Sequence, residues 1–144
     1  MLTIATPDEM FDLGKRIGSR LKTGDLILVN GPLGAGKTLL TQGIGASLGV
    51  FDITSPTFVI SRVHHAAIPL IHVDAYRLMQ LPHASLYLDD LDLDTENAIT
   101  VVEWGGIEAA RLSDERLEIS IDRTIDERVV TIVTHGARWA GFSL

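Results

Sequence analysis

The sequence contains no cysteine, no long apolar run and no cluster of basic residues. Without cysteine, disulfide bonds and thiolate metal sites are excluded, and the lack fits the reducing cytoplasm. No apolar stretch approaches the ~18 residues that a membrane-spanning helix needs. Residues 1–6 also lack the basic segment followed by an apolar segment that is typical of a secretory signal. We therefore expect a cytoplasmic protein that has no membrane segment.

Basic residues are also scarce. Lysine and arginine number 12 against 19 aspartates and glutamates, so the formal net charge is −7. The longest basic run is Lys15-Arg16, whereas nucleic-acid-binding proteins usually present a basic face. A dedicated nucleic-acid-binding protein is therefore disfavoured, and we expect any RNA to be held mainly by a partner. The length of 144 residues predicts one domain, residues 1–144, with a core of ordinary size.

The most informative segment is Gly31–Thr38, which matches the phosphate-binding pattern Gly, four residues, Gly-Lys-Thr. The apolar run Leu26–Val29 precedes it and a helical pattern follows, which is the context of a P-loop. Backbone amides of such a loop surround phosphates, while Lys37 adds a positive charge and the Thr38 hydroxyl can bind Mg²⁺. We expect Lys37 to be an exposed loop residue, and an incidental glycine-rich turn is the alternative. The candidate nucleotide-binding residues in this segment are Gly31, Leu33, Gly34, Ala35, Gly36, Lys37 and Thr38.

Hydrophobic periodicity predicts an alternation of helices and strands. The expected helices run from Thr6-Pro7 through Leu21 with a stop at Gly24, from Gly36 to Leu48, near Leu81–Leu88, and briefly within the tail 137–144. The expected strands are Leu26–Asn30, Phe58–Val63, Ile68–Val73, Ala98–Val102, Leu117–Ile121 and Val129–Val133. Gly43 and Gly45 each weaken the second helix by ~1 kcal/mol, for which close packing against the sheet would compensate. The predicted fold is α/β, a P-loop NTPase-like sheet flanked by helices, with mixed parallel and antiparallel strands.

Two carboxylates follow predicted strands, Asp74 after Leu70–Val73 and Glu103 after Ile99–Val102. In open α/β sheets the functional groups gather at these strand ends. Asp74 and Glu103 therefore join Lys37 as candidate catalytic residues for binding metal and positioning water, with surface carboxylates or helix caps as the alternative. The sequence does not decide which of the two positions the attacking water. No Asn-Lys-x-Asp segment for reading guanine is found, which favours ATP over GTP.

Four segments of the chain occur in a characteristic order. They are Gly31–Thr38, Ser55-Pro56-Thr57-Phe58, His72–Leu78 with the pattern His-x-Asp-x-Tyr-Arg, and Val102-Glu103-Trp104. Together they resemble the TsaE family, small bacterial ATPases needed to make threonylcarbamoyladenosine in the anticodon loop of tRNA. The resemblance covers roughly residues 5–135.

The resemblance implies roles for individual residues. Thr38 and Glu103 would bind Mg²⁺, and Asp74 would act near the γ-phosphate, in hydrolysis or in the outer shell of the metal. Thr57 would belong to a switch loop, for which a plain turn is the alternative, and Arg128 would contact the nucleotide. The cofactors implied are ATP and Mg²⁺.

The resemblance also implies partners similar to TsaB and TsaD, of which TsaD transfers the threonylcarbamoyl group. ATP hydrolysis by the TsaE-like chain would reset their complex, and tRNA would be met only through it. Some positions depart from the usual pattern, among them Met10 in place of threonine, Gly105 in place of proline, and the run Asp89–Glu96, which lacks the usual glycine. They bear on base contacts and on the partner surface rather than on the phosphate site.

Two other functions are compatible with the same loop. A P-loop kinase for a small molecule is one, although 144 residues leave little room for an acceptor lid. A non-catalytic module that interacts with partners when ATP is bound is the other.

Overall fold

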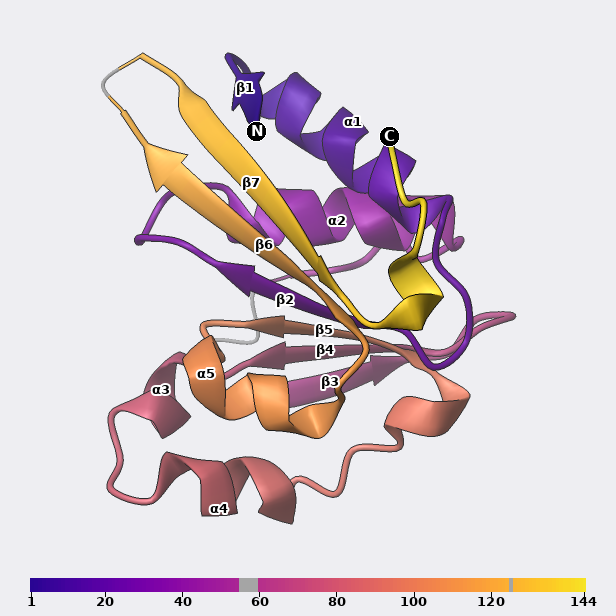
Figure 1. Ribbon diagram of the computed structural model, residues 1–144, viewed down its shortest axis with the longest axis vertical. Coiled ribbons are helices and arrows are strands. Elements are labelled where there is room, and N and C mark those ends of the chain that lie inside the picture. Colours follow the sequence, from indigo (N-terminus) through magenta and orange to yellow (C-terminus); the bar gives the residue numbers. More distant parts are fainter. Residues whose placement is uncertain (55–59, 125) are drawn as a thin grey trace.

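The computed structural model describes residues 1–54, 60–124 and 126–144. Its strands form one seven-stranded sheet in the order β1-β7-β6-β2-β5-β4-β3 (Figure 1). The strands are β1 Leu2–Ile4, β2 Leu26–Asn30, β3 Ser61–His64, β4 Leu70–Asp74, β5 Ile99–Glu103, β6 Arg116–Arg123 and β7 Arg128–His135. The α-helices are α1 Pro7–Gly18, α2 Lys37–Ser47, α3 Tyr76–Met79, α4 Ala84–Asp90 and α5 Gly106–Ala109. Short 3-10 turns lie at Thr95–Asn97, Ala110–Leu112 and Ala137–Trp139.

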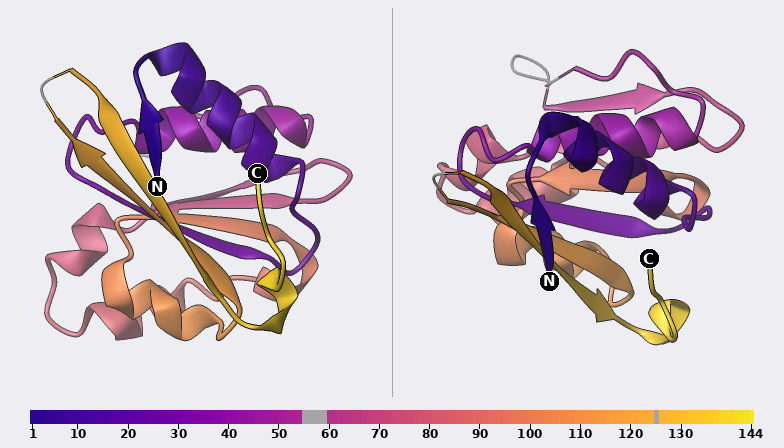
Figure 2. Two further views of the ribbon diagram at one scale, coloured as in Figure 1. Left: turned by 45° about the horizontal axis from the view of Figure 1, so that its top comes forward. Right: turned by 90° about the horizontal axis from the view of Figure 1, so that it is seen from above.

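The sheet is mixed, as the sequence predicted. Strands β6, β2, β5 and β4 are parallel neighbours, whereas β3 pairs with β4, and β7 with both β6 and β1, in antiparallel fashion. Figure 2 shows β1 and β3 at opposite edges of this sheet. The expected α/β fold with antiparallel edges is therefore confirmed, and the carboxyl ends of β2, β4 and β5 lie at one end of the sheet.

Helices cover both faces of the sheet. Helices α1 and α2 lie on one face and α3, α4 and α5 on the other (Figure 1). Because side chains alternate along a strand, β2 contributes Ile27 and Val29 to the first core cluster and Leu26 and Leu28 to the second. All four are at most 1% exposed. A strand buried on both faces reads as a continuous apolar run, which is why its bounds were predictable.

Helix α1 begins where the sequence predicted and ends earlier. The Thr6 hydroxyl accepts the Glu9 amide at 3.1 Å, and the Glu9 carboxylate accepts the Ala5 amide at 2.8 Å. Such reciprocal bonds satisfy amides that a helix N-terminus leaves free. The helix ends at Gly18, where Ser19 caps it, so the expected continuation through Leu21 is wrong. The apolar spacing of Leu21 belongs to the turn that follows, in which its amide donates to the Gly18 carbonyl.

The glycines of α2 serve helix contacts that the sequence did not indicate. A Cβ atom on Gly43 would lie 2.1 Å from the Phe11 carbonyl oxygen of α1, and one on Gly14 would lie 2.2 Å from the Leu40 carbonyl oxygen. The expected packing of Gly43 against the sheet is therefore wrong, because it packs against α1. Gly45 instead faces Ile53 and the Val50 carbonyl. The close approach of the two helices at Gly14 and Gly43 fixes α2 against α1, and thereby also fixes the first residues of α2, which follow the loop.

Most remaining elements agree with the sequence within a few residues. The two late strands form the expected hairpin β6–β7, and the tail contains a short 3-10 turn. The hairpin β3–β4 is also present, although the first two residues of the expected strand Phe58–Val63 lie outside the described residues. No helix in the described parts of the chain is both long and apolar enough to cross a bilayer.

Candidate nucleotide site

The loop between β2 and α2 has the backbone shape that its glycines allow. Gly34 has φ +75° and Gly36 has φ +107°, conformations that favour glycine because it lacks a Cβ atom. Gly36 is also the N-cap of α2, so the loop leads directly into a helix N-terminus. That end of a helix carries free amides and partial positive charge. The loop therefore has the features of an anion cradle.

Lys37 is the first residue of α2 and is only 5% exposed. Its ammonium donates to the carbonyls of Gly31 at 2.8 Å and Pro32 at 2.7 Å, and it lies 3.9 Å from the centre of the Trp104 ring. The expectation of an exposed loop lysine is therefore wrong, because the loop and Trp104 enclose the side chain. Burial lowers the pKa of Lys37, and the nearby Glu103 and Asp74 carboxylates offset part of that effect.

Asp74 and Glu103 end the adjacent parallel strands β4 and β5 and are paired in register. The structure thus brings together the two carboxylates that the sequence singled out, at the end of the sheet where the loop lies. Their surroundings differ. Asp74 is partly exposed and its Oδ1 accepts the Tyr76 amide at 3.0 Å, whereas Glu103 is 2% exposed.

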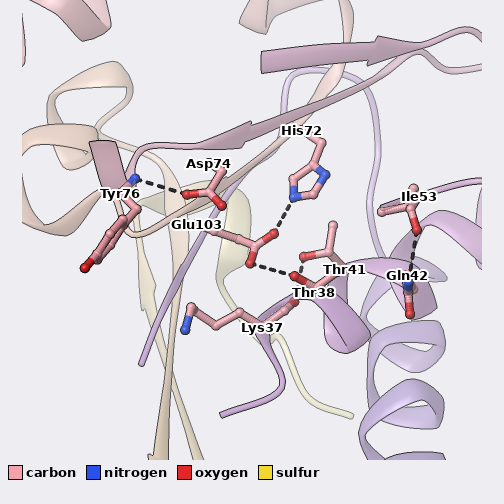
Figure 3. Close-up of polar contacts among 9 residues, drawn as sticks. All are labelled: Lys37, Thr38, Thr41, Gln42, Ile53, His72, Asp74, Tyr76 and Glu103. Atoms are coloured by element: carbon pink, nitrogen blue, oxygen red, sulfur yellow. Dashed lines mark hydrogen bonds and ion pairs between the residues drawn. The ribbon is translucent and has the colours of Figure 1, made fainter. Parts of the chain in front are cut away.

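Glu103 is held between two side chains (Figure 3). Its Oε1 lies 3.4 Å from the Thr38 hydroxyl, and its Oε2 forms a short hydrogen bond with His72 Nε2. His72 is fully buried. A carboxylate beside a hydroxyl is an oxygen donor pair of the kind that Mg²⁺ binds together with phosphate oxygens. The residues present therefore fit a magnesium-bound nucleotide.

Trp104 follows Glu103 with a backbone that side chains rarely adopt. Its φ is +65°, a conformation that costs about 1–3 kcal/mol outside glycine and is concentrated at functional sites. The Trp104 amide donates to the Val29 carbonyl at 3.1 Å, and its ring meets that of Tyr76 edge-on at 4.9 Å. This turn brings the indole over Lys37, beside the candidate metal ligand Glu103.

Two pockets flank the loop. The larger, of about 780 Å³, is lined by the loop, Asp74, Glu103 and Trp104, and also by Arg77. The smaller, of about 180 Å³, lies between the loop and the start of α1 and includes Arg128. Arg128 begins β7, and its guanidinium donates to the Gly34 carbonyl at 3.5 Å. The expected contact residue Arg128 is therefore beside the loop but outside the larger pocket, and Thr57 lies outside the described residues.

Comparison with known proteins identifies the family of the chain. The family model described as threonylcarbamoyl adenosine biosynthesis protein TsaE matches residues 4–130. The chain belongs to the TsaE family. The fold is similar to a solved one: the crystal structure of Bacillus subtilis YdiB superposes with a TM-score of 0.75 at 30% identity, covering 96% of this chain and 87% of that one.

Similar proteins that carry the family name come from several bacteria. One from Streptomyces coelicolor is 47% identical over 91% of this chain and 94% of its own. One from Bacillus subtilis is 35% identical over 92% of this chain and 84% of its own. Both are named tRNA threonylcarbamoyladenosine biosynthesis protein TsaE. The family is thus one of tRNA threonylcarbamoyladenosine biosynthesis, as the four sequence segments indicated.

No role in the site was predicted for two of its polar residues, Gln42 and His72, although His72 opens the His-x-Asp-x-Tyr-Arg pattern. His72 is two residues before Asp74, so strand alternation alone puts both on one face. Gln42 is one helical turn after Thr38, lines the larger pocket, and donates to the Ile53 carbonyl at 2.9 Å (Figure 3). The contact of His72 with Glu103 depends on the pairing of β4 with β5, and that of Gln42 with Ile53 depends on the path of the chain after α2, so neither contact was predictable from periodicity alone.

Proposed function

We propose that this chain hydrolyses ATP, with Mg²⁺, as one component of the machinery that makes threonylcarbamoyladenosine in tRNA. The observation that carries the proposal is the pairing of the Thr38 hydroxyl with the Glu103 carboxylate, 3.4 Å apart, beside Lys37 at the end of the loop. A loop threonine together with a carboxylate is the oxygen pair that holds Mg²⁺ against the phosphates in P-loop NTPases. Membership of the TsaE family supplies the biological setting.

The loop residues Leu33–Thr38 and the start of α2 hold the phosphates through backbone amides. Lys37 exchanges the carbonyls of Gly31 and Pro32, which it contacts at 2.8 and 2.7 Å, for phosphate oxygens. That exchange replaces two neutral acceptors by charged ones, which form stronger hydrogen bonds.

Thr38 and Glu103 would hold Mg²⁺, which would supply positive charge to offset that of the phosphates. Asp74 orients the attacking water, because Glu103 already contacts both Thr38 and His72. The Asp74 carboxylate is fixed at the pocket by the Tyr76 amide.

The nucleoside extends from the loop into the smaller pocket. That pocket shares Gly34 and Gly36 with the larger one and is lined on its far side by Met10 and Arg128. Its partly apolar walls suit a base, and the guanidinium of Arg128 suits a ribose or phosphate oxygen. Thr57, in the expected switch loop, remains a candidate for contact with the γ-phosphate.

The activity acts on a complex of partners resembling TsaB and TsaD, in the cytoplasm, and tRNA is met through that complex. The chain itself has a net charge of −7, which supports an indirect meeting with RNA.

The test combines hydrolysis and association. Purified chain is mixed with ATP and Mg²⁺, with and without the TsaB–TsaD pair, while free phosphate and complex formation are followed. We expect slow release of phosphate that changes when the pair is added, and loss of release in Asp74→Ala and Glu103→Ala. Absence of any association, with or without ATP, would count against the proposal. Transfer of phosphate to a metabolite would favour a kinase, and partner activity that survives both substitutions would favour a non-catalytic module.

A further inference from the structure

His72 is a fully buried polar residue that neither the P-loop pattern nor the strand-end carboxylates account for. It lies in the middle of β4 and is 0% exposed. Its register partner on β5 is Val101, two residues before Glu103, so the ring and the Glu103 carboxylate lie on the same face of the sheet. The ring nitrogen Nε2 meets Glu103 Oε2 (Figure 3).

This contact decides which way the carboxylate of Glu103 faces. An ionised carboxylate only accepts hydrogen bonds, so Nε2 of His72 is the donor. With Oε2 engaged on the sheet side, Oε1 is the oxygen left facing the Thr38 hydroxyl, at 3.4 Å. Loss of the donor would free the carboxylate to rotate and would leave a buried oxygen without a partner.

The state of the other ring nitrogen, Nδ1, indicates that packing alone does not explain a histidine at this position. His72 Nδ1 is buried and has no hydrogen-bond partner among the residues that the structure describes. An unsatisfied buried nitrogen costs stability, and an apolar side chain of similar volume would avoid that cost. In the part of the chain that the structure describes, the polar contact that can offset this cost is the bond to Glu103.

We propose that His72 is a positioning residue that holds Glu103 so that its free oxygen faces Thr38, and that it thereby sets the affinity of the site for a divalent cation. The inference rests on the proposed function, because it takes Glu103 and Thr38 as the cation ligands. Partners in the outer shell of a metal site commonly change metal affinity by 10–100-fold.

The experiment measures the affinity of the ADP-saturated protein for Mn²⁺ by electron paramagnetic resonance, and the melting temperature without metal. His72→Gln keeps an amide nitrogen near the position of Nε2, whereas His72→Asn is too short to reach Glu103, and both are neutral and polar. We expect His72→Asn to weaken Mn²⁺ binding at least tenfold and His72→Gln to remain within about threefold of the parent. Affinity for ADP in the presence of a chelator should be the same in both variants.

A matched control is His64→Gln. His64 is also buried, 7% exposed, and its Nδ1 lies 3.5 Å from Asp52; among the described residues it forms no hydrogen bond with Glu103. It should leave Mn²⁺ affinity unchanged.

Equal Mn²⁺ affinities for the two His72 variants would overturn the positioning role, and so would unfolding of both, since His72 would then serve the fold. Failure of the parent protein to bind ADP or Mn²⁺ would instead sink the proposed function, so the two failures are distinguishable.

Discussion

Two buried carboxylates lie at opposite ends of the central strands and have contrasting partners. Asp25 directly precedes β2 and is 4% exposed, while Glu103 ends the parallel neighbour β5 and is 2% exposed. Asp25 accepts two hydrogen bonds from Arg138, both of 2.9 Å, and one from the Lys22 amide at 2.7 Å. Glu103 has only His72 and the Thr38 hydroxyl within hydrogen-bond reach among the described residues.

In the proposed function, this difference separates a structural carboxylate, Asp25, from a cation ligand, Glu103. Asp25 has a full cationic partner with bidentate geometry, and the pair fastens the C-terminal turn to the start of β2. Glu103 has no arginine or lysine within ion-pair distance in the described part of the chain, although the Lys37 ammonium is near enough to interact with its charge. A buried carboxylate is costly without a full counter-charge, and in the proposed function Mg²⁺ would supply that charge.

The largest expected effect is on stability, and it comes from breaking the pair between Asp25 and Arg138. Arg138→Ala leaves Asp25 buried without its cation, and it also removes the bond to the Arg20 carbonyl and the stacking of the guanidinium 4.2 Å from the Trp139 ring. We expect the free energy of unfolding in urea to fall by about 3 kcal/mol. Hydrolysis of ATP by the folded fraction should be unchanged.

Arg111→Ala is the matched control. Arg111 also pairs with an aspartate, Asp89, at 3.4 Å, but both side chains are about half exposed, at 53% and 47%. An exposed pair contributes less than about 1 kcal/mol. If Arg138→Ala and Arg111→Ala destabilised the protein equally, burial of the Asp25–Arg138 pair would not explain its contribution to stability.

Glu103→Gln tests whether the second carboxylate, Glu103, serves activity rather than stability. It removes the charge while keeping the shape and an oxygen for His72. We expect ATP hydrolysis to fall about 100-fold, equivalent to ~2.7 kcal/mol, while the melting temperature without metal stays the same or rises. A drop in melting temperature comparable to that of Arg138→Ala would show that Glu103 is structural and would contradict its assignment as a cation ligand.

Lys37→Ala removes the positive charge nearest to Glu103. Nucleotide affinity measured by calorimetry should fall at least tenfold, equivalent to about 1.4 kcal/mol. Lys15→Ala is the control, since Lys15 is exposed on α1 and contacts only the Phe11 ring, at 5.9 Å, among the interactions that the structure gives it. Unchanged ADP binding in Lys37→Ala would contradict the claim that the positive charge of Lys37 contributes to nucleotide binding at the loop.

Features that one short segment specifies were predictable from the sequence, whereas features that depend on contacts between distant segments were not. Strand β2 and the loop were predictable because apolar residues followed by a glycine pattern specify them within one segment. The position of Asp74 and Glu103 at one end of the sheet was predictable because each follows an apolar run of residues. The pairing of His72 with Glu103 was not, since it depends on the register of β4 against β5.

Features that depend on distant backbone were also missed. The burial of Lys37 arises from the turn at Trp104, whose positive φ no propensity predicts. The partner of Asp25 comes from Arg138, 113 residues away in the sequence, so nothing local marked Asp25 as a paired residue.

The smallest expected effect concerns a third carboxylate, Glu118 on β6, which is paired but partly exposed. The hydrogen bond from Arg116, at 2.8 Å, lowers the pKa of Glu118 below its usual value of 4.5, outweighing the opposite effect of burial. Because the pKa is lower in the folded protein, the pair stabilises the fold above the unfolded value, and that stability is lost as pH falls through the folded value. We expect less than about 1 kcal/mol of stability to disappear below pH 4.5, and Glu118→Gln to abolish that part of the pH dependence in urea unfolding. A loss as large as that of Arg138→Ala would mean that exposure does not distinguish this pair from the one at Asp25.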